Sequence, residues 1–359
     1  MATRTAADRI RMKQRYLHLL SDLLDNFKDY LNEVARKKFG DIPRFVVLTN
    51  VNAVEKVGSK GLQLVKADFH SELGNLNLTI AIKEFSSGEE ALRNISLTNL
   101  IKKRLVPLPR ERMLKVSTPR VLMQHGATLI YEGIQGESFT ESNIDYFQKL
   151  GLAGLALSKY HSADIKSASP KRYLHLLKSV LAEIPIPAER RNKYFNQAAD
   201  ILEKLDLFNC GTAGFGDFHQ ENLMFSEVSD NGKKYTKSWL IDPEYAEGEE
   251  ARVDRMEDIA TFFLHTAISY YSREKDLKKL KNDLEYFFKG YNSYLRIHQM
   301  TLNKIYGNAE KSFCFHLGLN SLLEGLFAVK KGIPNDQATL DRTSLCLALA
   351  SHCWTNGLN

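Results

Sequence analysis

The sequence predicts an α+β protein with a small β-rich part followed by a larger, mainly helical part. Short strand-like runs separated by Gly, Asn and Ser fill residues 45–85, and apolar residues recur at three-to-four spacing through most of the chain after Gly136. The first pattern is typical of strands and the second of amphipathic helices. With 359 residues, of which 43% are hydrophobic, the chain is long enough to bury a core in two lobes without disulfides.

The domain boundaries follow from these changes of pattern. Apolar residues form one stripe over residues 5–38, which predicts a single helix that ends before Gly40 and Pro43. The predicted parts are a helical extension (1–42), a β-rich lobe (43–131), a short connector (132–136) and a helical lobe (137–359).

Local patterns then predict the individual elements of each lobe. In the β-rich lobe we expect an antiparallel sheet and one helix, with strands near 45–48, 61–66, 76–82, 120–123 and 128–131 and the helix at about 88–104. In the helical lobe, periodic segments predict helices at 141–162, at 188–206 and repeatedly after 255. One hairpin is expected there, from 223–225 and 239–241 around Asp230-Asn231-Gly232.

Charge and cysteine usage narrow the class of protein. The 49 basic and 43 acidic residues give a net charge of +6, and a surplus of four lies within residues 1–40. The rest is near neutral, so we expect no nucleic-acid partner, and the basic residues of the first helix are interpreted as a solvated face. No run of about 18 uncharged apolar residues occurs, so we expect no membrane span. Four scattered cysteines predict a reducing, cytoplasmic location.

One loop and the hairpin after it carry the strongest chemical pattern. Asp217 and Asn222 stand five residues apart, and Asp242 ends the hairpin. Carboxylate and amide oxygens are ligands that suit Mg²⁺, which leaves Asp217 to orient or deprotonate a hydroxyl. Positioning and charge neutralisation of this kind are what phosphoryl transfer requires. The alternative, that Asp217 and Asn222 only cap turns, is less consistent with the Ile-Asp that ends the hairpin.

Two further patterns lie in the β-rich lobe. Lys83 ends an apolar strand, where its ammonium needs a counter-charge. It could clamp nucleotide phosphates while paired with Glu89 or Glu90 of the next helix, between which the spacing does not decide, or it could extend to water from an edge strand. The turn 58–61 has two glycines that allow backbone N–H groups to approach phosphates, and a plain hairpin turn explains it equally well.

Taken together and in this order, these motifs resemble the aminoglycoside phosphotransferase/choline kinase branch of the protein-kinase-like superfamily. The resemblance covers roughly residues 45–270 and is most specific in two motifs. These are the loop Gly216–Asn222 and the segment Ile241-Asp242-Pro243-Glu244-Tyr245-Ala246. It implies a bilobal protein-kinase-like fold with an extra N-terminal helix.

The resemblance implies an ATP- and Mg²⁺-dependent kinase and assigns a role to each matching position. Asp217 would be the catalytic base, and Asn222 and Asp242 would hold Mg²⁺. The remaining assignments concern ATP and the loop: Lys83 on the α/β-phosphates with Glu90 or Glu89, Ser59 and Gly61 in the phosphate-binding turn, backbone groups of Glu132 and Ile134 on the adenine, and Asp258 bracing the catalytic loop.

The sequence departs from the family at the residue two before the catalytic Asp, where Phe215 replaces the usual His. The histidines of the sequence, including His161 and His219, are not spaced as metal ligands are. They are interpreted as ordinary interior or surface residues.

The acceptor is expected to be a hydroxyl of a small molecule such as a sugar, an amino alcohol or an aminoglycoside-like compound. Only 12 positions separate Asp242 from Asp254, which leaves no room for the activation segment of a protein kinase. Four glutamates at 244–250 are interpreted as a solvated loop, or alternatively as attracting a cationic acceptor. An inactive nucleotide-binding scaffold ranks second and a Ser/Thr protein kinase third, and the oligomeric state is not predicted.

Overall fold

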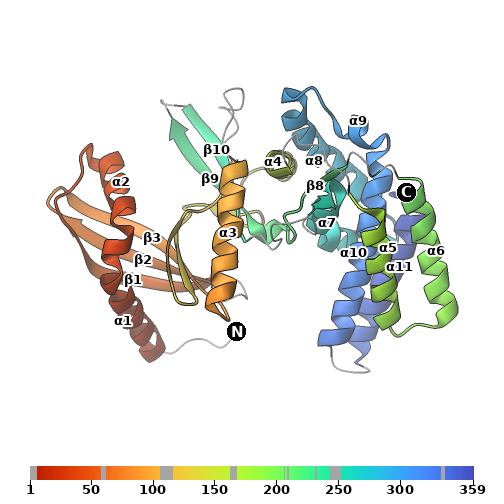
Figure 1. The fold of residues 1–359 in the computed structure, drawn as a ribbon, viewed down its shortest axis with the longest axis horizontal. Helices are drawn as coiled ribbons and strands as arrows, with labels where there is room; N and C mark the ends of the chain where they lie inside the picture. The colour runs from red at the N-terminus through yellow and green to blue at the C-terminus, as the bar shows by residue number, and fades with distance from the viewer. Residues whose placement is uncertain are drawn as a thin grey trace. The chain divides into compact units, whose positions relative to one another are not determined.

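The contacts of the chain divide it into two units. The computed structural model describes residues 6–57, 62–105, 116–161, 168–205, 207, 210–230, 233–242, 252–332 and 336–359. The sheet unit contains residues up to 102, 117–136 and 226–229, and the helical unit contains 103–116, 137–225 and the residues from 230 onward. Figure 1 shows the elements of both. An antiparallel sheet in one unit and a larger set of helices in the other confirm the predicted α+β class.

Five of the described strands form the antiparallel sheet of the sheet unit, in the order β1-β2-β3-β6-β5. Short apolar runs separated by Gly, Asn and Ser are the pattern that predicted them, and every predicted strand is confirmed at greater length. The helix that connects β3 to the later strands, α3, is confirmed with the predicted bounds. The elements are β1 Val46–Val57, β2 Leu62–Ser71, β3 Gly74–Glu84, α3 Gly88–Arg104, β5 Val121–His125 and β6 Thr128–Glu132.

The predicted single N-terminal helix is wrong in one respect, because it is broken into three pieces. They are α1 (Ala6–Asp22), the 3-10 turn η1 (Leu24–Phe27) and α2 (Lys28–Phe39). The break contains Asp25 and Asn26, whose short polar side chains favour turns over helix. It keeps the apolar stripe on one side, so Leu20 of α1 and Leu31 of α2 are both fully buried.

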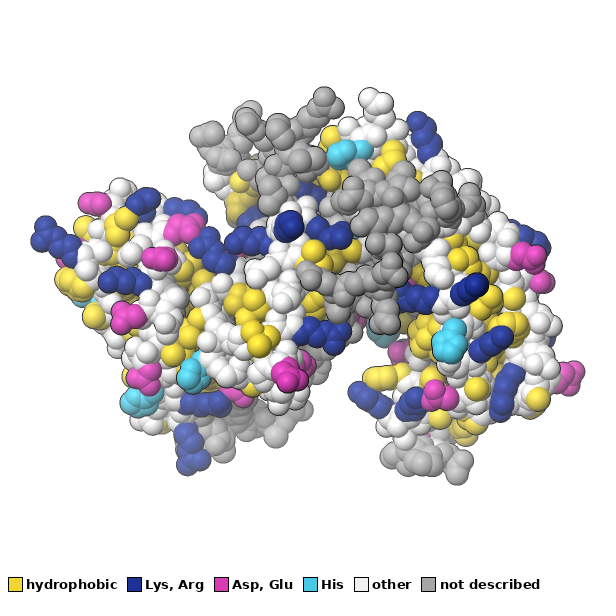
Figure 2. Space-filling model, in the orientation of Figure 1, with side chains coloured by type: hydrophobic (Ala, Val, Ile, Leu, Met, Phe, Trp, Pro, Cys, Tyr) yellow, Lys and Arg dark blue, Asp and Glu magenta, His cyan; other side chains and the backbone are white. Residues whose placement is uncertain are grey.

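Helices cover both faces of the sheet (Figure 1). Tyr16, Leu20 and Leu31 of the N-terminal helices share one buried cluster with Val65 and Ile80 of the sheet. On the opposite face, Ala91 of α3 packs with Ala81, Leu129 and Tyr131. The N-terminal helices therefore belong to the hydrophobic core of the sheet unit. The described basic side chains of α1 and α2 are exposed, and on the visible face of this unit basic and acidic side chains are mixed (Figure 2).

The helical unit is built around a few long helices. Helices α4 and α8 come close because Gly154 faces the Phe287 backbone and Gly290 faces that of Gly151, where a Cβ would lie 2.1 Å and 1.8 Å from the respective carbonyl oxygens. The helices are α4 Tyr146–His161, α5 Pro170–Glu183, α6 Ala188–Glu203, α7 Arg255–Glu274, α8 Lys278–Ile297, α9 Leu302–Tyr306, α10 Ala309–Lys331 and α11 Gln337–Thr355.

The helices predicted at 141–162 and 188–206 are confirmed as α4 and α6, with shorter bounds. Helix α4 begins five residues late because Asp145 accepts hydrogen bonds from the N–H groups of Phe147 and Gln148, at 3.0 and 3.1 Å, and so caps the helix. Helix α5 was not predicted.

The predicted hairpin is also confirmed. It consists of β9 (Leu223–Asp230) and β10 (Lys233–Leu240), which are neighbours in a sheet with the order β4-β10-β9-β7. Its turn residues 231–232 lie outside the described residues. The remaining short elements are β4 Val116–Ser117, β7 Glu137–Ser138, β8 Gly211–Ala213, the 3-10 turn η3 Gln220–Asn222 and β11 Arg252–Asp254.

Among the described residues, α10 is the one helix long and apolar enough to cross a membrane by length and composition. Of its most apolar window, 67% is buried inside the protein. It packs against α7 and α11, among other helices. Its apolar composition therefore has a packing role in the helical unit.

The shared core of the sheet unit leads to a stability prediction. Leu31→Ala should lower the free energy of unfolding by about 2–5 kcal/mol, because it leaves a cavity between α2 and the sheet. Urea denaturation measures this change. Ile10→Ala is the control, since this side chain is 59% exposed, and it should change stability by less than about 0.5 kcal/mol. Equal midpoints for the two variants would show that α2 does not share the core of the sheet.

Candidate active site

The loop that carries Asp217 is held by one buried carboxylate. Asp258, in the first turn of α7, accepts hydrogen bonds from the N–H of Phe215 at 2.7 Å and from that of Gly216 at 2.9 Å. Its side chain is fully buried. Bonds from backbone N–H groups to a carboxylate are charge-assisted and fix the loop strongly. The expectation that Asp258 braces the loop that carries Asp217 is confirmed.

A network of hydrogen bonds among buried side chains holds the carboxylate of Asp258 in place. The Nε2 of His161, the last residue of α4, lies 2.9 Å from Oδ2 of Asp258. Its Nδ1 lies 2.6 Å from the hydroxyl of Tyr291, which in turn accepts from Arg255 at 3.4 Å. Asp258 can only accept, so Nε2 carries the proton and Nδ1 accepts from Tyr291. His161 is thus an interior residue, as expected, and it also orients the carboxylate that holds the loop.

Burial determines the protonation of this network. It lowers the pKa of His161, although the hydrogen bond to Asp258 opposes the shift, and the imidazole is kept neutral. Burial also raises the pKa of Tyr291 to about 12, so the phenol keeps the proton that it donates to His161. The network thus has one fixed arrangement of donors and acceptors at neutral pH.

Phe215 occupies the position at which the family that the motifs resemble has His. Its ring is buried and packs edge-on against Tyr160 and Phe218, with ring centroids 5.4 and 5.6 Å apart. It contributes its backbone N–H to Asp258, while an imidazole reaches the same carboxylate from α4. The loop is therefore braced without a histidine at position 215.

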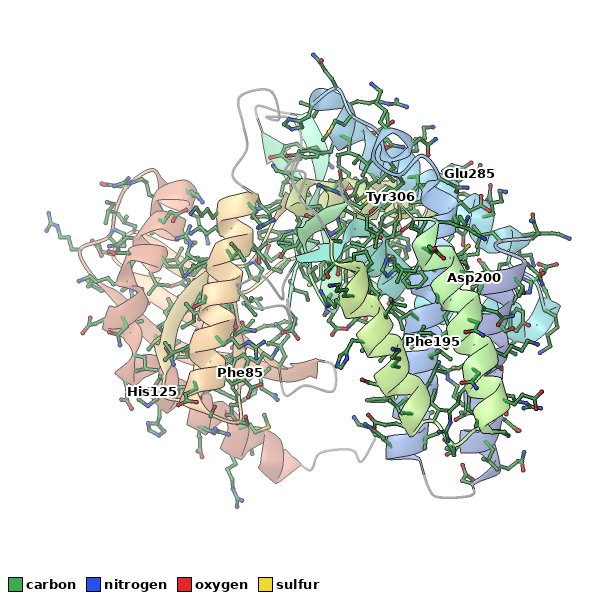
Figure 3. All side chains as sticks on the ribbon, turned by 45° about the vertical axis from the view of Figure 1, so that its right-hand side comes forward. Phe85, His125, Phe195, Asp200, Glu285 and Tyr306 are labelled. Carbon is green, nitrogen blue, oxygen red and sulfur yellow. The ribbon has the colours of Figure 1, made fainter. Side chains whose placement is uncertain are left out.

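The start of α7 is fixed by a second buried carboxylate. Asp254 caps the helix by accepting from the N–H of Met256 at 3.0 Å. It also accepts from Ser312 and His316, each at 2.9 Å, and from Tyr306, which is labelled in Figure 3. Asp258 is one turn further along α7, so the contacts that fix Asp254 also fix the position of Asp258 relative to the loop.

The loop folds back on itself between Asp217 and Asn222. The side-chain Nδ2 of Asn222 donates to the carbonyl oxygen of Asp217 at 2.7 Å and lies 3.5 Å from its Oδ2. The N–H of Asn222 donates to the carbonyl of His219 at 3.0 Å. With Nδ2 fixed in this way, the amide oxygen of Asn222 points away from the Asp217 carbonyl. The two residues are thus brought together as the loop pattern predicted.

His219 contacts the carboxylate of Asp217 and was missed as a site residue. Its Nδ1 accepts from the N–H of Glu221 at 3.2 Å, so its proton is on Nε2, which lies 3.3 Å from Oδ2 of Asp217. His219 therefore presents a donor to the carboxylate proposed as the base. Its place two residues after Asp217 in the same loop is the sequence signal that could have identified it.

Asp242 lies next to Asn222 through the backbone. The N–H of Ile241 donates to the carbonyl of Asn222 at 3.1 Å, and Asp242 follows immediately with the left-handed φ of 55°. Asp is one of the few residues that adopt this conformation at little cost, and strained backbone is common at functional sites. Asn222 and Asp242 offer oxygen donors of the kind that Mg²⁺ prefers, so the residues fit that ion. No cluster of three or more His, Cys, Asp and Glu that could hold a metal occurs in the described ranges.

Lys83 lies at the end of β3, on the face of the sheet that α3 covers. Side chains alternate along β3, so Lys83 follows Ala81 on this face, whereas Ile80 and Ile82 face the N-terminal helices. Its Nζ lies 5.0 Å from the ring centroid of Phe85, which is labelled in Figure 3. The residue as a whole is half-buried.

The two glutamates considered for Lys83 begin α3 and are exposed. The Glu90 carboxylate accepts from the N–H of Ser86 at 2.9 Å, and its own N–H donates to the hydroxyl of Ser87 at 3.1 Å. This arrangement caps the helix. The bonds from Ser86 are the main cause that lowers the pKa of Glu90, and the charge of Lys83 adds to them. The pairing of Lys83 with Glu90 or Glu89 stays a prediction.

The connector after β6 passes close to β3. Gly133 donates its N–H to the carbonyl of Thr79 at 3.0 Å, and a Cβ on Gly133 would lie 2.2 Å from that oxygen. The N–H of Glu132 donates to the carbonyl of Arg120 at 2.9 Å. An adenine would therefore have to use the carbonyl of Glu132.

Some predicted residues lie outside the part of the chain that the structure describes. They are Ser59 and Gly61 of the predicted phosphate-binding turn and the glutamates at 244–250.

Comparison with known proteins gives similarity of structure alone. No family model matches the sequence, and no curated protein sequence matches it. Solved structures of choline and ethanolamine kinases and of antibiotic phosphotransferases are similar to the chain, and these are the proteins that its motifs resemble.

Three of these structures illustrate the similarity. Choline kinase LicA from Streptococcus pneumoniae has 17% identity and a TM-score of 0.48 over 90% of this chain and 99% of that one. An ethanolamine kinase from Plasmodium vivax has 12% identity and a TM-score of 0.48 over 85% and 82% of the respective chains. The AMP-bound spectinomycin phosphotransferase APH(9)-Ia has 12% identity and a TM-score of 0.47 over 91% and 98%. Similarity at this level assigns no activity to the chain.

The His161 network leads to a prediction about pH. The folded protein keeps His161 neutral, whereas the unfolded chain protonates it near the ordinary pKa of 6.5. The unfolded state then binds more protons, so the free energy of unfolding falls as the pH drops below about 6.5. His161→Gln retains a donor but does not titrate, so urea denaturation between about pH 7.5 and 5.5 should show a smaller fall than in the unmodified protein. His125→Gln, at an exposed position labelled in Figure 3, is the control. An unchanged slope in His161→Gln would exclude this histidine as the cause.

Proposed function

We propose that this chain is a kinase that transfers the γ-phosphate of ATP to a hydroxyl group of a small molecule in a Mg²⁺-dependent reaction. The observation that carries the proposal is the geometry of the loop 215–222. Asp258 accepts hydrogen bonds from its first two N–H groups, and the carbonyl of Asn222 at its end accepts from the N–H of Ile241, the residue before Asp242. The loop and the hairpin end bonded to it would thus supply a carboxylate for the acceptor and two oxygen donors for a cation.

The proposal assigns a role to each candidate site residue. Asp217 orients the acceptor hydroxyl and takes its proton, and His219 fixes the Asp217 carboxylate from the side through Nε2. Asn222 and Asp242 would hold Mg²⁺, which when bound neutralises phosphate charge. In the sheet unit, Lys83 would bind the α/β-phosphates, with Glu90 or Glu89 as its partner, and the carbonyl of Glu132 and backbone of Ile134 would bind adenine. Ser59 and Gly61 complete the proposed nucleotide-binding set.

The proposed location is the cytoplasm. The four cysteines, Cys210, Cys314, Cys346 and Cys353, are free and buried. Burial is the main cause that raises the pKa of the Cys346 thiol to about 11, so this thiol stays protonated and unreactive. Free thiols of this kind are typical of proteins in a reducing compartment.

The base is tested by Asp217→Asn. Turnover should fall by about 10²–10⁴-fold, because the amide cannot take the proton, while binding of MgATP should change little. A panel of hydroxylated metabolites, with release of ADP as the readout, first identifies an acceptor and then measures the loss. Asp200→Asn makes the same chemical change at an exposed carboxylate of α6, labelled in Figure 3, and should leave turnover unchanged.

Two outcomes would contradict the proposal. Normal turnover in Asp217→Asn would show that another group is the base. Nucleotide binding without transfer to any acceptor by the unmodified chain would favour the inactive scaffold instead.

The cation site is tested by Asp242→Asn. Removing the charged ligand should raise the Mg²⁺ concentration needed for half-maximal activity by at least about tenfold. Activity is titrated against MgCl₂ at saturating acceptor, and Asp230→Asn at the other end of the hairpin is the control. A Mg²⁺ dependence equal to that of the unmodified chain would remove Asp242 from the site.

A further inference from the structure

Two ion pairs join the N-terminal helices to other residues of the sheet unit. One runs from α2 to Arg120, which directly precedes β5, and the other from α1 to the end of β3. All of these residues belong to the sheet unit. The hydrophobic contacts of Leu20 and Leu31 already attach the helices to the sheet, so the polar contacts need a separate explanation.

The first contact joins Glu33 of α2 to Arg120. Oε2 of Glu33 lies 2.7 Å from Nη1 of Arg120, and 38% of each side chain is exposed. The guanidinium of Arg120 also lies over the ring of Tyr30, one turn earlier on α2, at 5.8 Å from its centroid. Two residues of α2 therefore fix the direction of one arginine.

Arg120 is in turn bonded twice to Glu132, the last residue of β6. The N–H of Arg120 donates to Oε1 of Glu132 at 2.9 Å, and the carbonyl of Arg120 accepts from the N–H of Glu132, also at 2.9 Å. Both the backbone and the side chain of Glu132 are thus fixed by the residue that α2 holds. Gly133 follows directly and lies close to the backbone of Thr79. A change in the orientation of Glu132 would therefore also change the backbone of the connector.

The charges along this path are coupled. The hydrogen bond from Arg120 is the main cause that lowers the pKa of Glu33 to about 2. Burial, followed by the charge of Glu132, raises the pKa of Tyr30 to about 12. Alternating charges at Glu33, Arg120 and Glu132 stabilise one another, and removing the first leaves Arg120 with fewer constraints.

The second contact supports the other end of the proposed nucleotide site. Arg15 of α1 forms an ion pair with Glu84, the residue after Lys83 in β3. Glu84 pairs with Thr128 of β6, which is the strand that ends at Glu132. The two helices thus reach the end of β3, which precedes α3, and Arg120, which is hydrogen-bonded to the last residue of β6.

We propose that the N-terminal helices position the nucleotide site, with Glu33 and Tyr30 holding Arg120 and Arg120 holding Glu132 in the orientation that presents its carbonyl to adenine. Glu33 touches no nucleotide in this proposal and is a positioning residue. The inference rests on the proposed function and deepens it, because it gives the N-terminal helices a part in ATP binding.

The test measures binding of a non-hydrolysable ATP analogue with Mg²⁺ to the full chain by calorimetry. Glu33→Gln should raise the Kd of the analogue by about two- to fivefold, the range expected from a partly exposed ion pair. The KM for the acceptor should not change. Lys37→Gln is the matched control, because Lys37 is the other partner of Glu33, at 2.7 Å, and is exposed on α2. It should leave the Kd unchanged.

A second variant keeps the proposal testable if one substitution affects folding. Arg120→Met retains most of the apolar stem and the backbone bonds to Glu132, and it should raise the Kd at least as much as Glu33→Gln. Because both residues act along one path, the double variant should bind no more weakly than Arg120→Met alone. Thermal unfolding without nucleotide is recorded for each variant.

The outcomes separate this inference from the proposed function. A lower unfolding temperature with an unchanged Kd in Glu33→Gln, or additive losses in the double variant, would overturn the positioning role and leave the kinase proposal intact. Failure of the unmodified chain to bind the analogue would overturn the proposed function, and the inference with it.

Discussion

The contact between the buried carboxylate of Asp258 and the loop N–H groups is the constraint on which the rest of the site depends. A carboxylate removed from water is costly unless donors replace the lost hydration, and here the N–H groups of Phe215 and Gly216 and the imidazole of His161 do so. The direction of Asp217 is set by these bonds, since it follows Gly216 in the chain. Because the same loop ends at Asn222, Asp258 also fixes one of the two proposed cation ligands.

Phe215 shows how the loop is braced without a histidine at this position. The ring of Phe215 fills an apolar space between Tyr160 and Phe218, while the hydrogen bond to the carboxylate comes from α4. Asp258 can only accept, so Nε2 of His161 carries the proton, and Tyr291 donates to Nδ1. Asp258 needs a side-chain donor in order to brace the loop, and in this chain the donor is His161 of α4.

Local pattern was sufficient for most of the fold and failed where two local signals conflict. The strands follow from short runs of apolar residues separated by Gly, Asn and Ser, and α3 begins directly after Ser86 and Ser87, the residues that open it in the sequence. The break at Leu24–Phe27 was missed because the apolar period continues through it, while the turn preference of Asp25 and Asn26 acts within a single turn of helix. The start of α4 was placed too early for a related reason, since the cap at Asp145 is a local interaction that periodicity does not detect.

The sequence by itself determined the loop from Asp217 to Asn222, the hairpin that leads to Asp242 and the lysine that ends β3, because each depends on residues close together in the chain. The tertiary structure alone decided the supports of these residues. His161 and Asp258 are 97 positions apart, and Glu33 and Arg120 are 87 apart. No spacing rule connects positions so distant, because their contact depends on how whole helices and strands pack, and that packing is fixed by apolar burial throughout each unit.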